Sequence, residues 1–201
     1  EIIGNGIARA EDIPEFAGKI RQEAARLLSL IEDIIKLSRL DENELTSRFE
    51  RVDLAEVCRS VVKKLSDKAR NANVSLSFTG SSCAVSGIES ILHEIIFNLT
   101  DNAIIYNREG GEAHISLTES DGQATLVVED TGIGIAHEHL DRIFERFYRV
   151  DKSHSRETGG TGLGLSIVKH GALLHGASIR LESEPGQGTR VTLVFPCAEA
   201  E

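Results

Sequence analysis

The sequence predicts an α+β fold: a mixed β-sheet with helices on one face, forming a two-layer α/β sandwich, preceded by one long helix. In the N-terminal part, apolar residues recur in steps of four and three, as in helical bundles. After residue 47, short strand-like runs and helical stretches are interleaved without a regular βαβ alternation, which favours a mixed sheet. The 201 residues, 40% hydrophobic, suffice for one domain and an extra element. We therefore expect a helical segment at 1–47 and a domain at 48–201.

The long helix is expected to begin near Asp12 and Glu15, which have the spacing of a capping box around Pro14. Its apolar stripe is wider than one coiled-coil seam, which suits a helix packed against two or three others. We expect a four-helix bundle made by two chains, and the alternative is a plain core helix of a single domain. The seam comprises Ile20, Ala24, Leu27, Ile31, Ile34 and Ser38, widened by Leu28, Leu30, Ile35 and Leu37.

The domain after residue 47 should contain three helices and a sheet. Asp53 and Ser86 each precede a glutamate by three residues and are predicted to cap helices, through Leu65 in the first case and through Asn102 in the second. Asp121 and Gly122 indicate a hairpin turn. A third helix is expected from Leu163 to about Leu174. Strands are expected at 74–78, 114–118, 124–129, 179–181 and 191–195, with short ones at Val52 and 83–85.

Composition excludes several classes of protein. The net charge is −10 and the isoelectric point about 5.2, so a nucleic acid or an anionic membrane surface would be repelled. No apolar run reaches the roughly 18 residues of a membrane span. Cys58, Cys83 and Cys197 are too scattered for a metal knuckle or a disulfide framework, so we expect reduced thiols in the cytoplasm. Because the chain opens on Glu1, we expect it to be a fragment.

Two asparagines point to a magnesium ion. Asn98 and Asn102 are four residues apart, which places both amides on one side of a helix. Asparagine is a poor residue for a helix interior, and an amide oxygen can complete the coordination shell of Mg²⁺. The alternative is a pair of solvent-facing amides.

Asp130 follows the apolar run 126–128, where a carboxylate needs a hydrogen-bond donor, and an adenine amino group is one such donor. Gly132 and Gly134 leave room for a flat ring beside the backbone. A turn at the end of a strand explains the same D-x-G-x-G pattern.

A second glycine-rich stretch has the character of a phosphate site. Gly160, Gly162 and Gly164 precede a helix, and free amides at a helix N-terminus favour phosphate. Neither the P-loop nor the dinucleotide-binding pattern occurs. Between the two glycine stretches, the aromatic residues of 144–148 recur at helical spacing beside Arg146, Arg149 and Lys152. These residues predict a small amphipathic helix, which can also serve as a lid over phosphates.

Five ordered motifs together resemble those of sensor histidine kinases, and with the long helix the resemblance covers nearly the whole chain. The motifs are HEIIFNLTDNAIIYN (93–107), DTGIG (130–134), RIFERFYRVD (142–151), GGTGLGLSIVK (159–169) and ESEPGQGT (182–189), which look like the N box, first G box, F box, second G box and third G box. The helix at 24–42 resembles the second helix of the dimerisation and phosphotransfer domain.

The resemblance implies an ATP-binding domain of the type shared by gyrase, a class of heat-shock chaperones, histidine kinases and mismatch-repair ATPases. Asn98 would be the Mg²⁺ ligand and, with Glu94, a candidate catalytic residue. Asn102 would lie near the phosphates, and Asp130 would read the adenine. The other expected nucleotide contacts are Tyr106, Gly132, Gly134, Ile135, Phe147, Arg149, Lys152, Gly160, Thr161, Gly162, Leu163, Gly164, Leu165 and Thr189.

The same resemblance implies phosphoryl transfer from ATP to a histidine and then to an aspartate of a response regulator, largely through positioning and charge neutralisation. The parent protein would be a homodimer joined through the helical bundle, and this segment the cytoplasmic part of a membrane-anchored sensor.

The sequence departs from the family pattern at two places. Ile105 stands where a lysine often precedes the aromatic residue of the N box, so we expect weaker nucleotide affinity, which Ile105→Lys should increase. None of the seven histidines has the H-E-x-x-T-P context of a phosphate acceptor, and His93 lies within the N box itself. We therefore expect that this chain binds ATP without phosphorylating itself.

The sequence is also compatible with two other functions. Glu94 lies one turn before Asn98, where hydrolysing relatives carry a general base, so an ATPase is one alternative. The other is a dimerisation relic that binds no nucleotide.

Overall fold

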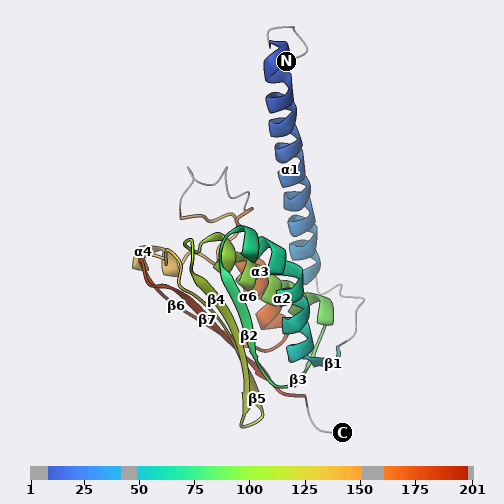
Figure 1. The fold of residues 1–201 in the computed structure, drawn as a ribbon. Coiled ribbons are helices and arrows are strands. Elements are labelled where there is room, and N and C mark those ends of the chain that lie inside the picture. The colour runs from blue at the N-terminus through green and yellow to red at the C-terminus, as the bar shows by residue number, and fades with distance from the viewer. Residues whose placement is uncertain (1–8, 42–48, 151–160, 199–201) are drawn as a thin grey trace.

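The computed structural model describes residues 9–41, 49–150 and 161–198. A 3₁₀ turn, η1 (Ala10–Asp12), leads into the long helix α1 (Ile13–Asp41). Figure 1 shows α1 standing away from a body of sheet and helices. The expected start of the long helix is thus within one residue of the observed one.

The main sheet has five strands in the order β2-β4-β5-β7-β6. β2 pairs with β4 in parallel and the remaining neighbours are antiparallel, so the sheet is mixed, as predicted. Asp121 and Gly122 have φ of 52° and 72° in the predicted hairpin turn between β4 and β5. The bounds are β2 (Ser75–Gly80), β4 (Glu112–Ser120), β5 (Gln123–Asp130), β6 (Ser178–Glu184) and β7 (Gly188–Pro196).

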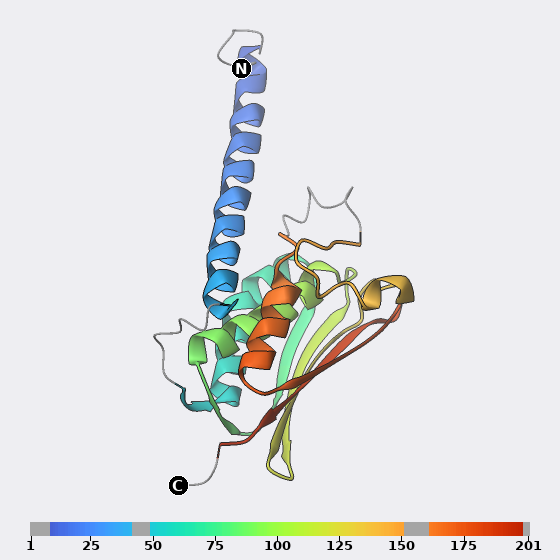
Figure 2. The same ribbon diagram turned by 180° about the vertical axis from the view of Figure 1, so that it is seen from behind.

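Three helices cover one face of this sheet: α2 (Leu54–Asn71), α3 (Glu89–Ile105) and α6 (Gly164–Leu174). Figure 2 shows these helices gathered on one side of the strands. Alternate strand residues such as Ile115, Leu126 and Leu193 are fully buried beneath these helices. The other face of the sheet is polar, and there His114 hydrogen-bonds to the hydroxyls of Ser77 and Thr79. The two-layer sandwich is therefore confirmed, with one solvated face.

A second, two-stranded sheet joins β1 (Glu50–Asp53) to β3 (Ala84–Gly87). Asp53 ends β1 and caps α2, because its Oδ1 accepts a hydrogen bond from the Ala55 amide at 2.8 Å. The cap predicted at Ser86 is wrong: Ser86 lies in β3, and α3 begins after Ile88, which provides no side-chain cap.

The amphipathic helix predicted in the insert, the segment between the two glycine-rich stretches, is also not observed. Helix α4 (His137–Leu140) is short, and residues 141–150 form turns. Phe147 has a φ of 63°, and its amide donates to the Gly162 carbonyl instead of to a preceding turn of helix. The insert therefore packs against the second glycine-rich stretch through its backbone.

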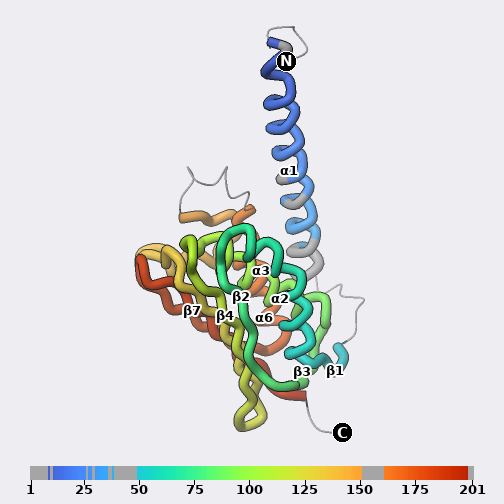
Figure 3. Tube along the Cα trace, viewed as in Figure 1, coloured from blue at the N-terminus to red at the C-terminus, as the bar shows by residue number. Residues whose placement is uncertain are grey.

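α1 touches the body over a short stretch, where Leu30 packs against Leu163 and Ile167 of the segment leading into α6. Figure 3 shows how much of its trace stands clear of the other elements. Seven of its large apolar side chains are exposed: Ile13, Ile20, Leu27, Leu28, Ile31, Ile34 and Ile35. No helix in the described ranges is long and apolar enough to cross a membrane.

Candidate functional site

The first component of the site is the amide of Asn98 on α3. Asn98 is half-buried, and its Nδ2 atom is fully buried with no hydrogen-bond partner among the described residues. A buried amide without a partner is costly, so such a group calls for a ligand atom. The Asn98 Oδ1 lies 3.1 Å from the position that a Cβ on Gly164 would take. A side chain at position 164 would therefore have to displace this amide by a few tenths of an ångström.

The second component is the N-terminus of α6. Its N-cap, Leu163, offers no side-chain hydrogen bond, so the first amides of the helix have no capping group from that residue. Gly162, just before it, has a φ of 75°, a conformation that favours glycine. These amides and the Asn98 side chain meet at one place, which suits an anion.

The third component is Asp130 at the end of β5. Its Oδ1 accepts hydrogen bonds from the amides of Gly132 at 2.8 Å and Thr189 at 3.3 Å. Within the described ranges no hydrogen bond reaches its Oδ2, which leaves an acceptor for a ligand donor. Burial raises the pKa of this carboxyl above its usual value, and the two amides oppose that change.

The glycines around Asp130 are required by the protein's own backbone. A Cβ on Gly134 would overlap the Glu184 carbonyl oxygen, and one on Gly132 would overlap the Tyr106 carbonyl oxygen. Gly134 also has a φ of 68°. The D-x-G-x-G pattern thus has a packing function here, and contact of Gly132 and Gly134 with a base stays a prediction.

Ser183 is a residue of this region that the sequence did not single out. Its Oγ accepts from the Ile135 amide at 2.8 Å, donates to the Gly188 carbonyl at 2.7 Å and lies 3.0 Å from the Thr189 hydroxyl. It therefore ties the first glycine turn to the β6–β7 hairpin. The one sequence feature that could have indicated Ser183 is its position inside the third glycine motif, at 182–189.

The insert contacts the phosphate end of the site. The Arg149 Cγ lies 3.3 Å from the position of a Cβ on Gly162, so the stem of this side chain passes close to the α6 N-terminus. Phe147 is exposed, while Tyr148 hydrogen-bonds to His139 Nδ1 at 2.7 Å and lies under the Arg142 guanidinium. Lys152 and Gly160, both expected to contact nucleotide, lie outside the described residues.

The remaining predicted residues are dispersed around these components. Glu94 and Asn102 are partly exposed, one turn before and one turn after Asn98 on α3. Tyr106 follows the end of α3 and is 40% exposed. Leu163 is fully buried and Leu165 packs against the main core, so a nucleotide would meet the backbone of these two residues.

Thr161 adds an unexpected contact to α1. Its hydroxyl donates to Asp33 Oδ2 at 2.7 Å, and it also accepts from the Leu163 amide at 3.3 Å. One residue of the second glycine motif is thereby fixed by the long helix.

The distance between the two ends of the site suits a nucleoside triphosphate. Asn98 lies beside the α6 N-terminus, and Tyr106, eight residues along α3, contacts the Asp130 end through its carbonyl bond to the Ile133 amide. Eight residues of helix span about 12 Å. A cavity of about 400 Å³ borders this end of the site along the solvated face of the sheet, and Asp130, Ser183 and Thr189 form part of its lining. Its lining includes Glu112, Glu129, Glu182 and Glu184, which would repel a triphosphate.

Comparison with known proteins agrees with this geometry. The family model described as "Histidine kinase-, DNA gyrase B-, and HSP90-like ATPase" matches residues 87–199, a range that contains the three components described above.

Among curated relatives, the sensor-like histidine kinase SenX3 of Mycolicibacterium smegmatis is 41% identical over 94% of this chain and 50% of its own length. The phosphate regulon sensor protein PhoR of Pseudomonas aeruginosa is 36% identical over 90% of this chain and 41% of its own. The chain thus spans about half, or less, of the length of these relatives.

Among solved structures, the mycobacterial sensor histidine kinase MprB is 30% identical with a TM-score of 0.66, covering 76% of this chain and 99% of its own. Full-length ShkA in complex with AMPPNP gives 27% identity and a TM-score of 0.79, over 96% of this chain and 40% of its own. The chain belongs to the histidine kinase-, DNA gyrase B-, and HSP90-like ATPase family, and it carries an ATP-binding domain of the sensor histidine kinase type.

Proposed function

We propose that this chain binds Mg-ATP and is the catalytic part of a sensor histidine kinase, which transfers the γ-phosphoryl group to a histidine. The observation that carries the proposal is the buried Asn98 Nδ2, which has no partner in the described part of the chain, on a side chain whose Oδ1 faces the α6 N-terminus. Residues 48–201 would form the catalytic domain and residues 1–47 the end of the dimerisation and phosphotransfer domain.

Asn98 is the residue proposed to hold Mg²⁺, which would neutralise phosphate charge and bridge phosphate oxygens. Rotating the amide by 180° exchanges its oxygen and nitrogen, so the side chain can offer an oxygen to the metal or an N–H to a phosphate. Asp130 Oδ2 would accept from the adenine amino group. Asn102, Arg149 and the first amides of α6 would orient the phosphates.

The acceptor histidine is proposed to lie outside this chain. All seven histidines are at position 93 or later, and none belongs to the 1–47 segment. The phosphoryl group would pass on to an aspartate of a response regulator. The parent kinase would dimerise through its helical bundle, be anchored in a membrane and hold this segment in the cytoplasm.

Calorimetric titration of the chain with Mg-ATP and Mg-ADP tests nucleotide binding. Asn98→Ala should weaken Mg-ATP binding by about 10- to 150-fold, the range for loss of an interaction with a charged group of about 1.5–3 kcal/mol. Asn71→Ala, at an exposed helix end, is the matched control and should bind as the wild type does. No heat of binding in the wild type would favour the dimerisation relic.

Two assays separate the kinase from the ATPase. Incubation with γ-labelled ATP should leave no acid-labile label on the chain, and stable label would overturn the assignment of the acceptor. Phosphate release should be negligible and unaffected by Glu94→Ala. Sustained release that Glu94→Ala abolishes would favour the ATPase, which the kinase relatives do not favour.

A further inference from the structure

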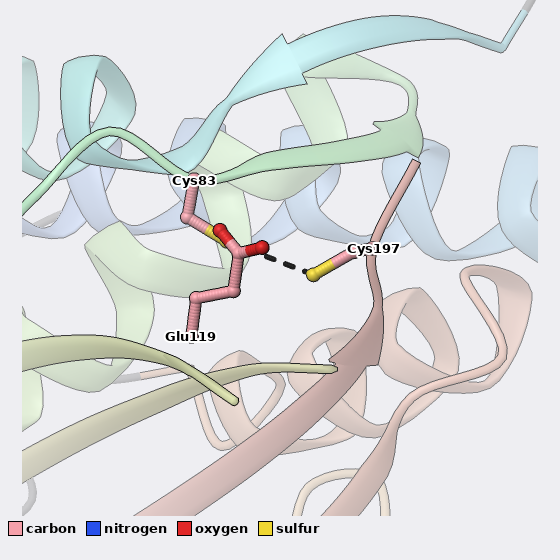
Figure 4. A group of neighbouring side chains, drawn as sticks. All are labelled: Cys83, Glu119 and Cys197. Carbon is pink, nitrogen blue, oxygen red and sulfur yellow. Dashed lines mark hydrogen bonds between the residues drawn. The ribbon is translucent and has the colours of Figure 1, made fainter. Parts of the chain in front are cut away.

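Three side chains with metal-binding atoms meet at the end of the sheet far from the α6 N-terminus: Cys83, Glu119 and Cys197 (Figure 4). The thiol sulfurs are 3.9 Å apart, and both lie within 4.8 Å of a Glu119 carboxylate oxygen. The two cysteines are 114 residues apart in sequence, which is why no metal motif was recognisable. The fold alone creates the group.

The distance between the sulfurs fits a shared tetrahedral metal ion. Two thiolates at about 2.3 Å from one zinc ion, with a tetrahedral angle between them, are about 3.8 Å apart. A carboxylate oxygen at about 2.0–2.2 Å is a suitable third ligand. The observed sulfur separation therefore needs almost no adjustment to accept the ion.

The backbone holds each of the three residues in place. The Cys83 amide donates to Asp53 Oδ1 and its carbonyl accepts from the Leu54 amide, at 3.2 and 2.9 Å. The Cys197 amide donates to the Gly122 carbonyl at 2.9 Å, and Cys197 also forms a β-bridge with Val85. Glu119 lies within β4, paired with Ala124 of β5. The ligand set is thus largely preorganised.

The charges around the group also favour a cation. None of the ion pairs found in the described part of the chain uses Glu119. The negative charge of the Glu119 carboxylate is therefore available to a bound cation.

We propose that Cys83, Glu119 and Cys197 form a binding site for a thiophilic divalent cation, of which Zn²⁺ is the best match. Two thiolates, one carboxylate and one water complete a tetrahedral shell. The ion would join the β1–β3 sheet to the ends of β4 and β7. It would therefore stiffen the part of the domain through which the chain enters from α1, without touching the nucleotide site.

The test is metal binding to the full chain, kept reduced with a phosphine. Zn²⁺ should bind with 1:1 stoichiometry in competition with a chromophoric chelator. Co²⁺ should give thiolate-to-metal charge-transfer absorption and the intense visible bands of tetrahedral cobalt. Cys83→Ser or Cys197→Ser should weaken Zn²⁺ binding by more than about 100-fold, and Glu119→Gln by about 10- to 100-fold, since even outer-shell changes reach that range.

Cys58→Ala is the matched control, because Cys58 is a buried thiol of α2 outside the group. It should keep wild-type Zn²⁺ affinity and the cobalt spectrum. Circular dichroism of each variant establishes that it is folded. Absence of 1:1 binding in the wild type, an octahedral cobalt spectrum, or unchanged affinity in Glu119→Gln would each overturn the three-ligand site. Rapid formation of a Cys83–Cys197 disulfide that Zn²⁺ does not slow would also overturn it.

Discussion

α1 and α3 both carry apolar side chains along their length, and the surroundings of those side chains differ almost completely. α3 lies between α2, α6 and the sheet, and Leu92, Ile95 and Ile96 are at most 1% exposed. Leu27 and Leu28 on α1 are 57% and 62% exposed. Hydrophobic periodicity thus reports which face of a helix is apolar, while the identity of the covering element depends on the rest of the chain and its partners.

The largest effect expected from this difference is on stability. Ile95→Ala should reduce the free energy of unfolding by about 2–5 kcal/mol, because it empties a buried site beside Gly171. Leu27→Ala should change it by less than about 0.5 kcal/mol in the monomer. Urea denaturation followed by circular dichroism measures both.

The same pair of variants shows whether a second copy covers α1. If it does, the loss in Leu27→Ala grows with protein concentration, whereas the loss in Ile95→Ala does not. Equal, concentration-independent losses would contradict the contrast between the two helices.

Within the catalytic domain, the first glycine turn should be intolerant of side chains. Gly134→Ala places a Cβ against the Glu184 carbonyl oxygen, at a φ of 68°. Gly110→Ala is the control, since Gly110 has a similar φ of 74° and nothing within 4 Å of the added Cβ. Gly134→Ala should therefore be less stable than Gly110→Ala by about 1–3 kcal/mol in thermal or urea unfolding. Similar losses would show that the turn moves freely.

The contact between α1 and Thr161 should contribute less to the free energy of unfolding than the glycine turn does. A double-mutant cycle of Asp33→Ala and Thr161→Val should give a coupling free energy of about 1 kcal/mol, as for a partly buried hydrogen bond. Urea unfolding of the four proteins provides the cycle. A coupling energy of zero would mean that this hydrogen bond does not help to hold α1 to the body.

The smallest effect concerns pH. Buried His175 donates from Nδ1 to the Gly171 carbonyl and accepts the Ile88 amide at Nε2, so it is neutral in the fold. Burial lowers its pKa, which means that the unfolded chain binds the proton more readily. Its contribution to stability is complete above the unfolded pKa of about 6.5 and is lost as pH falls through the folded pKa.

Thermal melts between pH 5 and 8 should therefore show the melting temperature rising with pH. His175→Gln should melt lower at pH 8 and show a shallower slope. Burial also lowers the pKa of His93, so the difference in slope between wild type and variant isolates His175. An unchanged slope would contradict the assignment of a buried neutral imidazole.

Much of the fold followed from local rules. The β4–β5 hairpin, the cap at Asp53 and the start of α6 were predictable because each depends on residues adjacent in sequence. The predicted insert helix was wrong because Phe147 bonds to Gly162 across the second glycine stretch, a non-local contact that periodicity does not encode.

In the candidate site too, some features follow from residues adjacent in sequence and others from contacts between distant residues. Asn98, Asp130 and the glycines were identified from motif spacing, yet the contact of Gly164 with Asn98 and the role of Ser183 required the folded arrangement. The glycines at 132 and 134 were attributed to a ligand, and their overlap with Tyr106 and Glu184 carbonyls gives them a packing reason as well. Nothing in the sequence marked Asp33 as part of the site, because its hydrogen-bond partner Thr161 lies 128 residues away.

The edge position of β6 has a consequence for solubility. Its outward residues Arg180, Glu182 and Glu184 line the strand that ends the described sheet, with Arg180 paired to Glu182 at 2.8 Å. An unpaired edge invites another chain to add a strand, and charged side chains oppose that addition. β6 is thus protected from strand addition, and the exposed apolar side chains of α1 offer a surface better suited to self-association than this edge.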